Sequence, residues 1–336
     1  MDTLDERLLD DFQRDFPLVP RPYLELAHRL GASEDDVITA LARLVNQGSV
    51  SRVGATFVPG RIGAATLATM SVPLQRLRQV AELISSFPEV NHNYEREHRY
   101  NLWFVVTGAD KHQVDARVQE IERAARCGPV LSLPMVEPYH VDLGFAVSGA
   151  AAPRRSFGHD FDYARPQPPV FSPGEQQLLT ALQEGLPLVT TPYAALAQRV
   201  GMTEAAVQAT LERWLESRVI NRLGVIVRHH ELGYRANAMV VWDVPDAEVR
   251  AVGRRAAAAP YVTLCYQRRR CLPDWRYNLY CMIHGKERAG VLAQIAALRA
   301  NCDLMPYPYE VLFSRQRFKQ RGARYAPTAA AAVAHG

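Results

Sequence analysis

The apolar positions of the chain follow helical spacing first and strand spacing afterwards, and this order of patterns occurs twice. A helix that ends at Gly31 precedes one capped by Ser33, and Gly201 and Thr203 take the same places in the back half. Glycine after a helix and a hydroxyl side chain before the next are typical boundary signals. Each half is therefore predicted to begin with a winged helix-turn-helix unit. The expected helices and strand are residues 6–16, 23–30, 34–47 and 50–57 in front, and 193–200, 204–217 and 219–227 behind.

A second block of alternating elements follows each winged unit. The order strand, helix, strand, strand, helix, strand predicts a ferredoxin-like fold, in which two helices cover one face of an antiparallel sheet. The front elements are expected at residues 64–72, 75–86, 90–97, 99–107, 112–125 and 130–137. The back elements are expected at residues 236–244, 246–258, 262–268, 277–284, 287–300 and 302–313.

The two halves also share residues at a constant offset. Gly31 and Gly201 are 170 positions apart, as are Arg52 and Arg222. We therefore expect an α+β fold with two tandem copies of a winged helix-turn-helix and a ferredoxin-like βαββαβ domain, which form a pseudo-dimer on one chain. The expected segments are 1–58 and 174–228 (winged units), 60–145 and 230–325 (ferredoxin-like), 146–173 (linker, rich in proline, glycine and alanine) and 326–336 (disordered tail).

Composition narrows the class of protein. The chain has 336 residues, a formal net charge of +4 and 48% hydrophobic residues. No apolar run reaches the roughly 18 residues that a membrane span needs, and the acidic N-terminus lacks the apolar core of a signal peptide. The five cysteines include no C-x-x-C pair. We expect a cytoplasmic protein with free thiols, no membrane association and no metal site of its own.

The presumed recognition helices of the winged units are acidic. Residues 34–47 and residues 204–217 each carry three acidic side chains against one arginine and no lysine. A helix that enters the major groove needs basic or amide side chains and cationic neighbours for phosphate. The sequence therefore predicts that nucleic acid is not a partner.

Two strand hairpins carry the most specific motifs. The front hairpin reads VNHNYEREHRYNLWFVVTG (residues 90–108), and the back hairpin reads VTLCYQRRRCLPDWRYNLYCMIHG (residues 262–285). With RHHELGYRANAMVVWDVP (228–245) and SRQRFKQRG (314–322), they resemble the siroheme decarboxylases. The two halves resemble the two subunit types of that enzyme joined on one chain, and the architecture resembles the feast/famine (leucine-responsive) regulators. The resemblance spans nearly the whole chain apart from linker and tail.

This resemblance implies a carbon–carbon lyase. Siroheme would lose CO₂ from its acetate side chains at C12 and C18, giving 12,18-didecarboxysiroheme for haem d1 or alternative haem biosynthesis. The iron belongs to the substrate, and acid catalysis by histidine needs no redox cofactor. The implied partner is an iron tetrapyrrole, and further self-association or contact with other haem-biosynthesis enzymes stays open.

Side chains on the hairpins suit such a ligand. Siroheme is flat and carries eight carboxylates, so its site needs aromatic surfaces and forked cationic donors. The same aromatics could form a core, and the arginines could line a solvated turn. The candidate binding residues are Tyr94, Arg96, Asn101, Trp103, Tyr266, Arg268, Arg270 and Asn278, together with His92 and His229.

Histidines are the candidate acids. Strand alternation puts His284 on the same face as Asn278, Tyr280 and Met282, whereas the matching front position holds Thr107. His98 lies at the front hairpin tip, where the back copy has an insertion. We expect His98 and His284 to be the catalytic pair, with His92 and His229 as alternatives or as ligands of the substrate iron. One productive pocket, in which siroheme turns between two decarboxylations, fits this asymmetry.

Two other functions stay open. The first is a tetrapyrrole-responsive regulator that binds DNA, which the acidic recognition helices disfavour. The second is a small-molecule module without catalysis, because this fold also serves as a ligand-binding domain.

Overall fold

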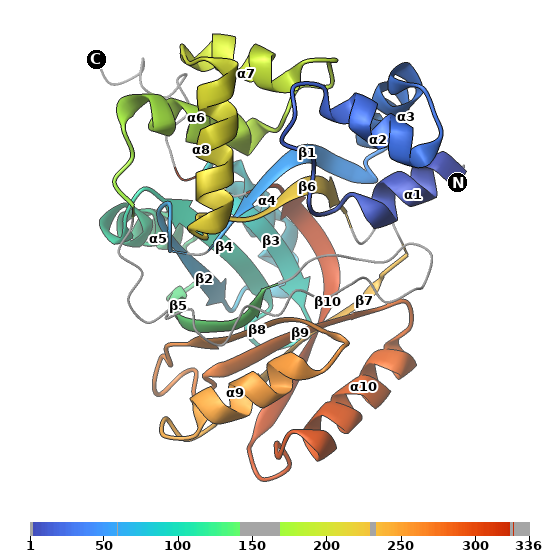
Figure 1. Cartoon of the computed structure of the whole chain (residues 1–336). Helices are drawn as coiled ribbons and strands as arrows, with labels where there is room; N and C mark the ends of the chain where they lie inside the picture. Colours follow the sequence, from blue (N-terminus) through green and yellow to red (C-terminus); the bar gives the residue numbers. More distant parts are fainter. Residues whose placement is uncertain (1–2, 59, 142–168, 229–232, 323–324, 326–336) are drawn as a thin grey trace.

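The computed structural model describes residues 3–58, 60–141, 169–228, 233–322 and 325. Six helices and two strands gather at one end of the molecule, and eight strands with four further helices form the other (Figure 1). No helix in these described ranges is long and apolar enough to cross a membrane. All five cysteines are free thiols, as the sequence predicts.

The two winged units share one hydrophobic core. Their strands β1 (Val50–Phe57) and β6 (Ile220–Val227) pair with each other in antiparallel fashion, so neither half completes its wing alone. The first helix ends at Asp11 instead of residue 16, because the backbone around Phe12 and Phe16 bonds to β6. The six helices are α1 (Thr3–Asp11), α2 (Pro22–Leu30), α3 (Glu34–Asn46), α6 (Pro173–Glu184), α7 (Pro192–Val200) and α8 (Glu204–Glu216).

The other eight strands close into a single barrel in the order β10-β3-β4-β2-β5-β8-β9-β7. Each half contributes a four-stranded sheet, and the pairs β10·β3 and β5·β8 join the two sheets at both edges. The strands are β2 (Ala64–Met70), β3 (Val90–Arg96), β4 (Leu102–Gly108), β5 (Leu131–Val141), β7 (Ala236–Trp242), β8 (Val262–Arg268), β9 (Leu279–Gly285) and β10 (Tyr309–Gln320).

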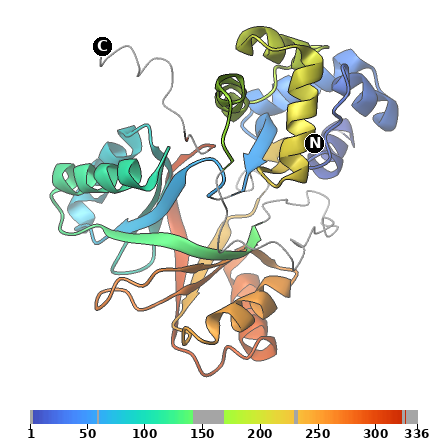
Figure 2. The same ribbon diagram turned by 60° about the vertical axis from the view of Figure 1, so that its left-hand side comes forward.

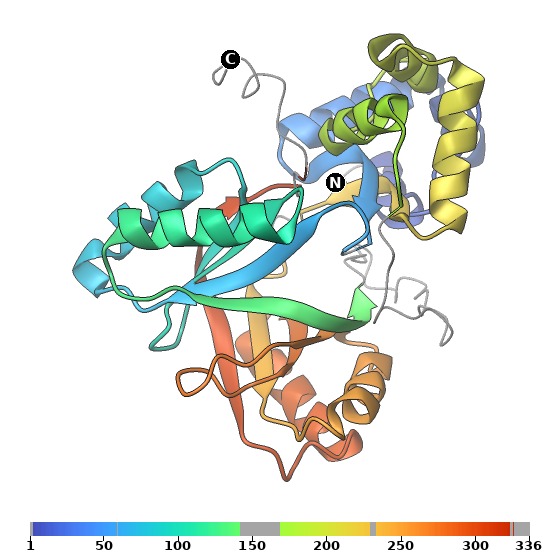
Figure 3. The same ribbon diagram turned by 90° about the vertical axis from the view of Figure 1, so that its left-hand side faces the viewer.

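Helices cover the outer faces of the two sheets, with α4 and α5 against the front sheet and α9 and α10 against the back sheet (Figure 2; Figure 3). The inner faces meet in a separate apolar cluster inside the barrel. Each sheet is therefore buried on both faces, and the barrel interior is a space that both halves line. The four helices are α4 (Leu77–Ser86, preceded by the short 3₁₀ helix η1, Leu74–Arg76), α5 (Lys111–Ala125), α9 (Val249–Ala258) and α10 (Arg288–Asn301).

The last strand lies further along the chain than the pattern predicts. It was expected at residues 302–313, but β10 covers Tyr309–Gln320. Pro306 and Pro308 precede it, and proline cannot donate a hydrogen bond to a sheet ladder. The polar end of β10 is a strand because it pairs with β3 of the other half, and this pairing helps to close the barrel.

Candidate active site

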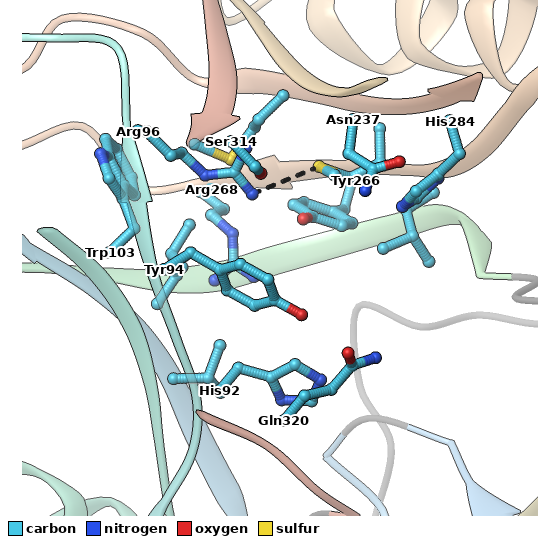
Figure 4. A pocket seen from close by; sticks show the side chains of 15 residues that line it. His92, Tyr94, Arg96, Trp103, Asn237, Tyr266, Arg268, His284, Ser314 and Gln320 are labelled. Atoms are coloured by element: carbon cyan, nitrogen blue, oxygen red, sulfur yellow. Dashed lines mark hydrogen bonds between the residues drawn. The ribbon is translucent and has the colours of Figure 1, made fainter. Parts of the chain in front are cut away.

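A pocket opens inside the barrel and contains about 730 Å³ of space, counting its mouth. Strands of both halves supply its walls, and the described residues that line it include no aspartate or glutamate (Figure 4). The lining residues are Leu67, His92, Tyr94, Arg96, Trp103, Val105, Asn237, Met239, Leu264, Tyr266, Arg268, Met282, His284, Ser314 and Gln320.

Two buried arginines occupy equivalent places in the two halves. Arg96 ends β3 and donates from Nη1 to the carbonyl of Leu312 at 3.0 Å, and Arg268 ends β8 and donates to that of Leu133 at 2.7 Å. Each keeps a buried Nε–H without an acceptor among the described residues. Burial lowers the pKa of Arg96 to about 10. Two cations that have no carboxylate beside them among the residues described favour an anionic ligand.

Aromatic rings form the flat parts of the pocket. The guanidinium of Arg96 lies 5.8 Å from the ring centre of Tyr94, and that of Arg268 lies 4.6 Å from that of Tyr266. Trp103 lies at one end of the pocket in Figure 4, and His284 lies at the other. A planar ligand with negative groups at its edge would therefore meet both aromatic faces and cationic donors.

Two histidines line the pocket, one from each half. His92 lies in β3 opposite Gln320, and His284 lies in β9 opposite Asn237 (Figure 4). Burial lowers the pKa of His92 to about 4, so its ring is neutral at neutral pH. Its Nδ1 atom is buried and lacks a hydrogen-bond partner in the described part of the chain. The neutral ring of His92 is thus suited to bind a metal, whereas His284 remains the candidate acid.

His98 does not line this pocket. The expectation that His98 and His284 work as a pair is not supported by their placement. The His98 ring stacks on Tyr100 at 5.9 Å and meets the edge of Trp275 at 5.4 Å, and its Nδ1 accepts from the backbone N–H of Tyr100 at 3.0 Å. Trp275 in turn packs against Trp103 at 5.1 Å. The aromatic side chains of the back hairpin therefore separate His98 from the cavity.

Arg270 lies outside the pocket as well, so the structure does not support its expected role in substrate binding. Its guanidinium forms ion pairs with Asp243 and Asp246 and donates to the carbonyl of Val244 at 2.6 Å. These acceptors already satisfy it. The three consecutive arginines at residues 268–270 therefore have different surroundings, and Arg268 alone of the three lines the cavity.

Asn101 and Asn278, two further expected binding residues, are not among the residues that line the pocket, and their side chains bond to the backbone. The side-chain amide of Asn101 bonds both the N–H and the carbonyl of Val72, at 2.9 and 2.8 Å. Asn278 bonds Val244 in the same way, at 3.0 and 2.9 Å. Both amides are buried and close the end of a strand. Their recurrence in the two halves reflects the fold.

Replacing Asn101 by alanine is expected to lower the free energy of unfolding by about 2–4 kcal/mol, because two buried backbone groups of Val72 lose their partner. Urea unfolding followed by circular dichroism measures this change. The exposed Asn46 provides a control, since Asn46→Ala should shift stability by no more than about 0.5 kcal/mol. Equal stability of the two variants would contradict the structural role.

The remaining expected site residue, His229, lies outside the described residues. Sequence reasoning missed Asn237, Ser314 and Gln320, which also line the pocket. The last two fall in the SRQRFKQRG motif, which was noted without a role for its side chains. This motif lies on β10, which pairs with both β3 and β7, and that pairing places its side chains at the pocket. The hydrophobic pattern of the sequence does not reveal such a pairing.

Comparisons with known proteins place the chain in a family. A model described as the Siroheme decarboxylase NirDL-like HTH domain matches residues 5–50 and 175–220, and one described as the AsnC-like ligand binding domain matches residues 61–140 and 231–319. The Siroheme decarboxylase NirDL subunit of Paracoccus denitrificans (strain Pd 1222) is 45% identical over 98% of this chain and 99% of its own length. The chain belongs to the siroheme decarboxylase NirDL family.

Other members agree with the tandem architecture. The NirL subunit of Stutzerimonas stutzeri is 48% identical, over 45% of this chain and 89% of its own length. A crystal structure of the siroheme decarboxylase NirDL superposes with a TM-score of 0.69 at 26% identity, covering 97% of this chain and 95% of that one. A second, in co-complex with an iron-uroporphyrin III analogue, gives 0.68 at 27% identity over 96% and 94%. The expected family and the tandem α+β fold are thereby confirmed.

Proposed function

We propose that this chain is a siroheme decarboxylase that removes CO₂ from the acetate groups at C12 and C18, yielding 12,18-didecarboxysiroheme for haem d1 or alternative haem biosynthesis in the cytoplasm. The observation that carries this proposal is the pair of buried arginines, which have no carboxylate partner among the described residues, in an aromatic pocket lined by His92 and His284. A NirDL family structure with an iron-uroporphyrin III analogue supports an iron tetrapyrrole as the ligand.

The reaction needs a proton donor and no electron carrier. Protonation of the ring carbon next to the acetate-bearing carbon creates an electron-accepting cation. The bond to the carboxylate then breaks, CO₂ leaves, and its electron pair forms an exocyclic double bond. A second proton converts the methylene to a methyl group while the ring carbon loses its proton, so each CO₂ released consumes one proton. The chemistry supports a mechanism without a redox cofactor.

The pocket residues divide this work. Arg96 and Arg268 bind carboxylates of the macrocycle, and Tyr94 and Tyr266 pack against its faces. His284 delivers the proton. His92, whose ring burial keeps neutral, ligates the iron.

The arginines and tyrosines of the pocket recur at equivalent positions of the two halves, but neither His92 nor His284 has a histidine at its equivalent position. Leu264 takes the place of His92 in β8, and Thr107 takes the place of His284 in β4. We therefore propose that one end of the pocket serves both decarboxylations. Because the arginines match across the two halves, siroheme can bind either way round and present each acetate in turn to His284.

Anaerobic incubation with siroheme, followed by mass spectrometry of the recovered tetrapyrrole, tests this function. We expect loss of two CO₂ per siroheme, with a mono-decarboxylated intermediate that appears free in solution before the final product. Binding without loss of mass would contradict the enzyme and leave a ligand-binding module.

A DNA-binding regulator is the alternative that the fold raises. The first turn of α3 carries Glu34, Asp35 and Asp36, and that of α8 carries Glu204. These carboxylates stabilise the helix N-termini and repel phosphate. A salt-dependent mobility shift of promoter DNA in the presence of siroheme would favour the regulator over the proposed enzyme.

A further inference from the structure

The pocket histidine His284 is held from the neighbouring strand by a threonine. Oγ1 of Thr263 in β8 lies 2.8 Å from Nδ1 of His284 in β9. The same Oγ1 donates to the backbone carbonyl of Met282 at 3.1 Å. A hydroxyl has a single hydrogen and two lone pairs, so its hydrogen is committed to the carbonyl. With the hydroxyl hydrogen on this carbonyl, Oγ1 is left to accept from His284, and Nδ1 then carries a hydrogen.

This contact decides which nitrogen of His284 titrates. When one ring nitrogen donates a fixed hydrogen bond, the other carries the lone pair in the neutral ring and gains the proton in the charged ring. In His284 that other nitrogen is Nε2. The carbonyl of Met282 thus orients the hydroxyl hydrogen of Thr263, and the hydroxyl oxygen in turn selects the tautomer of the His284 ring.

The front half lacks this arrangement. Asn91 stands in β3 where β8 has Thr263, and Thr107 stands where β9 has His284. Oγ1 of Thr107 donates to the carbonyl of Glu89 at 3.1 Å, and the amide oxygen of Asn91 is buried without a partner among the described residues. The threonine–histidine pair occurs where the pocket has its candidate acid.

We propose that Thr263 is a positioning residue, which holds His284 in the Nδ1–H form so that Nε2 exchanges the proton with siroheme. Thr263 does not touch the reacting atoms in this account and acts through the ring alone. The tautomer of His284 follows from the hydrogen bonds of Thr263. The effect of this tautomer on catalysis rests on the proposed decarboxylation.

The tautomer can be measured without substrate. Long-range ¹H–¹⁵N correlation of the imidazole rings, with His284 assigned through His284→Gln, distinguishes a protonated Nδ1 from a protonated Nε2. We expect neutral His284 to carry its hydrogen on Nδ1 in the wild type and in Thr263→Ser, and to lose this preference in Thr263→Val. A wild-type ring protonated on Nε2 would overturn the proposal, whether or not the chain decarboxylates siroheme.

Kinetics test the consequence for catalysis. In Thr263→Val we expect kcat to fall about 10- to 100-fold with KM unchanged, because a hydrogen bond to a charged ring is lost. The pH above which kcat declines should move down by about half to one unit, since the hydroxyl stabilises the charged ring more than the neutral one. Thr263→Ser should restore both values.

Thr66 supplies the matched control. Thr66 is also a buried threonine on a strand of the barrel, but its hydroxyl lies 3.0 Å from Oγ of Ser132 and contacts no histidine in the structure described. Thr66→Val should therefore leave the pH profile where it is. An unshifted profile in Thr263→Val, or the same shift in Thr66→Val, would overturn the positioning role. A wild type that does not decarboxylate siroheme, although its His284 carries the hydrogen on Nδ1, would instead refute the proposed function. The hydrogen-bond arrangement of Thr263 and His284 would then still hold.

Discussion

Replacing His284 by glutamine is expected to lower kcat for siroheme decarboxylation by about 10²- to 10⁴-fold, the range that a positioned proton donor contributes. Glutamine keeps a hydrogen-bonding group of similar length near Thr263 but cannot supply a proton at neutral pH. Siroheme should still bind, because Arg96 and Arg268 are untouched. Single-turnover incubation under anaerobic conditions, with products separated by chromatography, gives the rate.

His98→Ala is the matched control for this prediction. His98 packs against Tyr100 and Trp275 outside the pocket, so its loss should leave the rate of decarboxylation close to that of the wild type. A fully active His284→Gln variant would refute the assignment of the acid. A His98→Ala variant that decarboxylates siroheme slowly while its Tm is unchanged would instead assign a proton-handling role to His98.

Replacing Arg96 by methionine is expected to weaken siroheme binding and to stabilise the empty protein at the same time. Loss of one partner of a buried charge pair costs about 2–5 kcal/mol of binding free energy, roughly 30- to 4,000-fold in Kd. Without siroheme the same charge is desolvated and has no carboxylate beside it in the described part of the chain, so an apolar side chain of similar length should raise the free energy of unfolding by about 1–3 kcal/mol.

Absorption titration gives the Kd, and urea unfolding of the empty protein gives the stability. Arg315 is a suitable control, because it lies on β10 next to Ser314 and its side chain is exposed. Arg315→Met should change neither quantity appreciably. A variant Arg96→Met that binds siroheme as the wild type does would contradict the role of the arginine pair. Arg268→Met should behave as Arg96→Met does.

The sequence predicts most of the element order, because helix boundaries and strand alternation are local signals. Gly31 and Gly201 end their helices as expected, and both adopt the left-handed conformation. Closure of the barrel is not predictable in this way. It depends on pairing between β10 and β3 and between β5 and β8, whose strands lie in different halves and leave no periodic signature.

The candidate site was predictable where strand alternation and internal repetition agree. Tyr94 and Arg96 recur as Tyr266 and Arg268, and alternation placed His284 on the inner face. Repetition alone could not distinguish residues that line the pocket from residues that stabilise the fold, since Asn101 and Asn278, which bond to the backbone, recur as well. That His98 lies outside the pocket lining was not predictable, because its contact with Trp275 of the inserted back hairpin is a tertiary contact without a sequence signal.

A crystal structure of His284→Gln with siroheme, grown without oxygen so that the substrate persists, would test the location of the site most directly. We expect the macrocycle inside the barrel between Tyr94 and Tyr266, with carboxylates on both Arg96 and Arg268 and one acetate directed at position 284. A tetrapyrrole bound outside the barrel, beside His98 or against the winged units, would contradict this account.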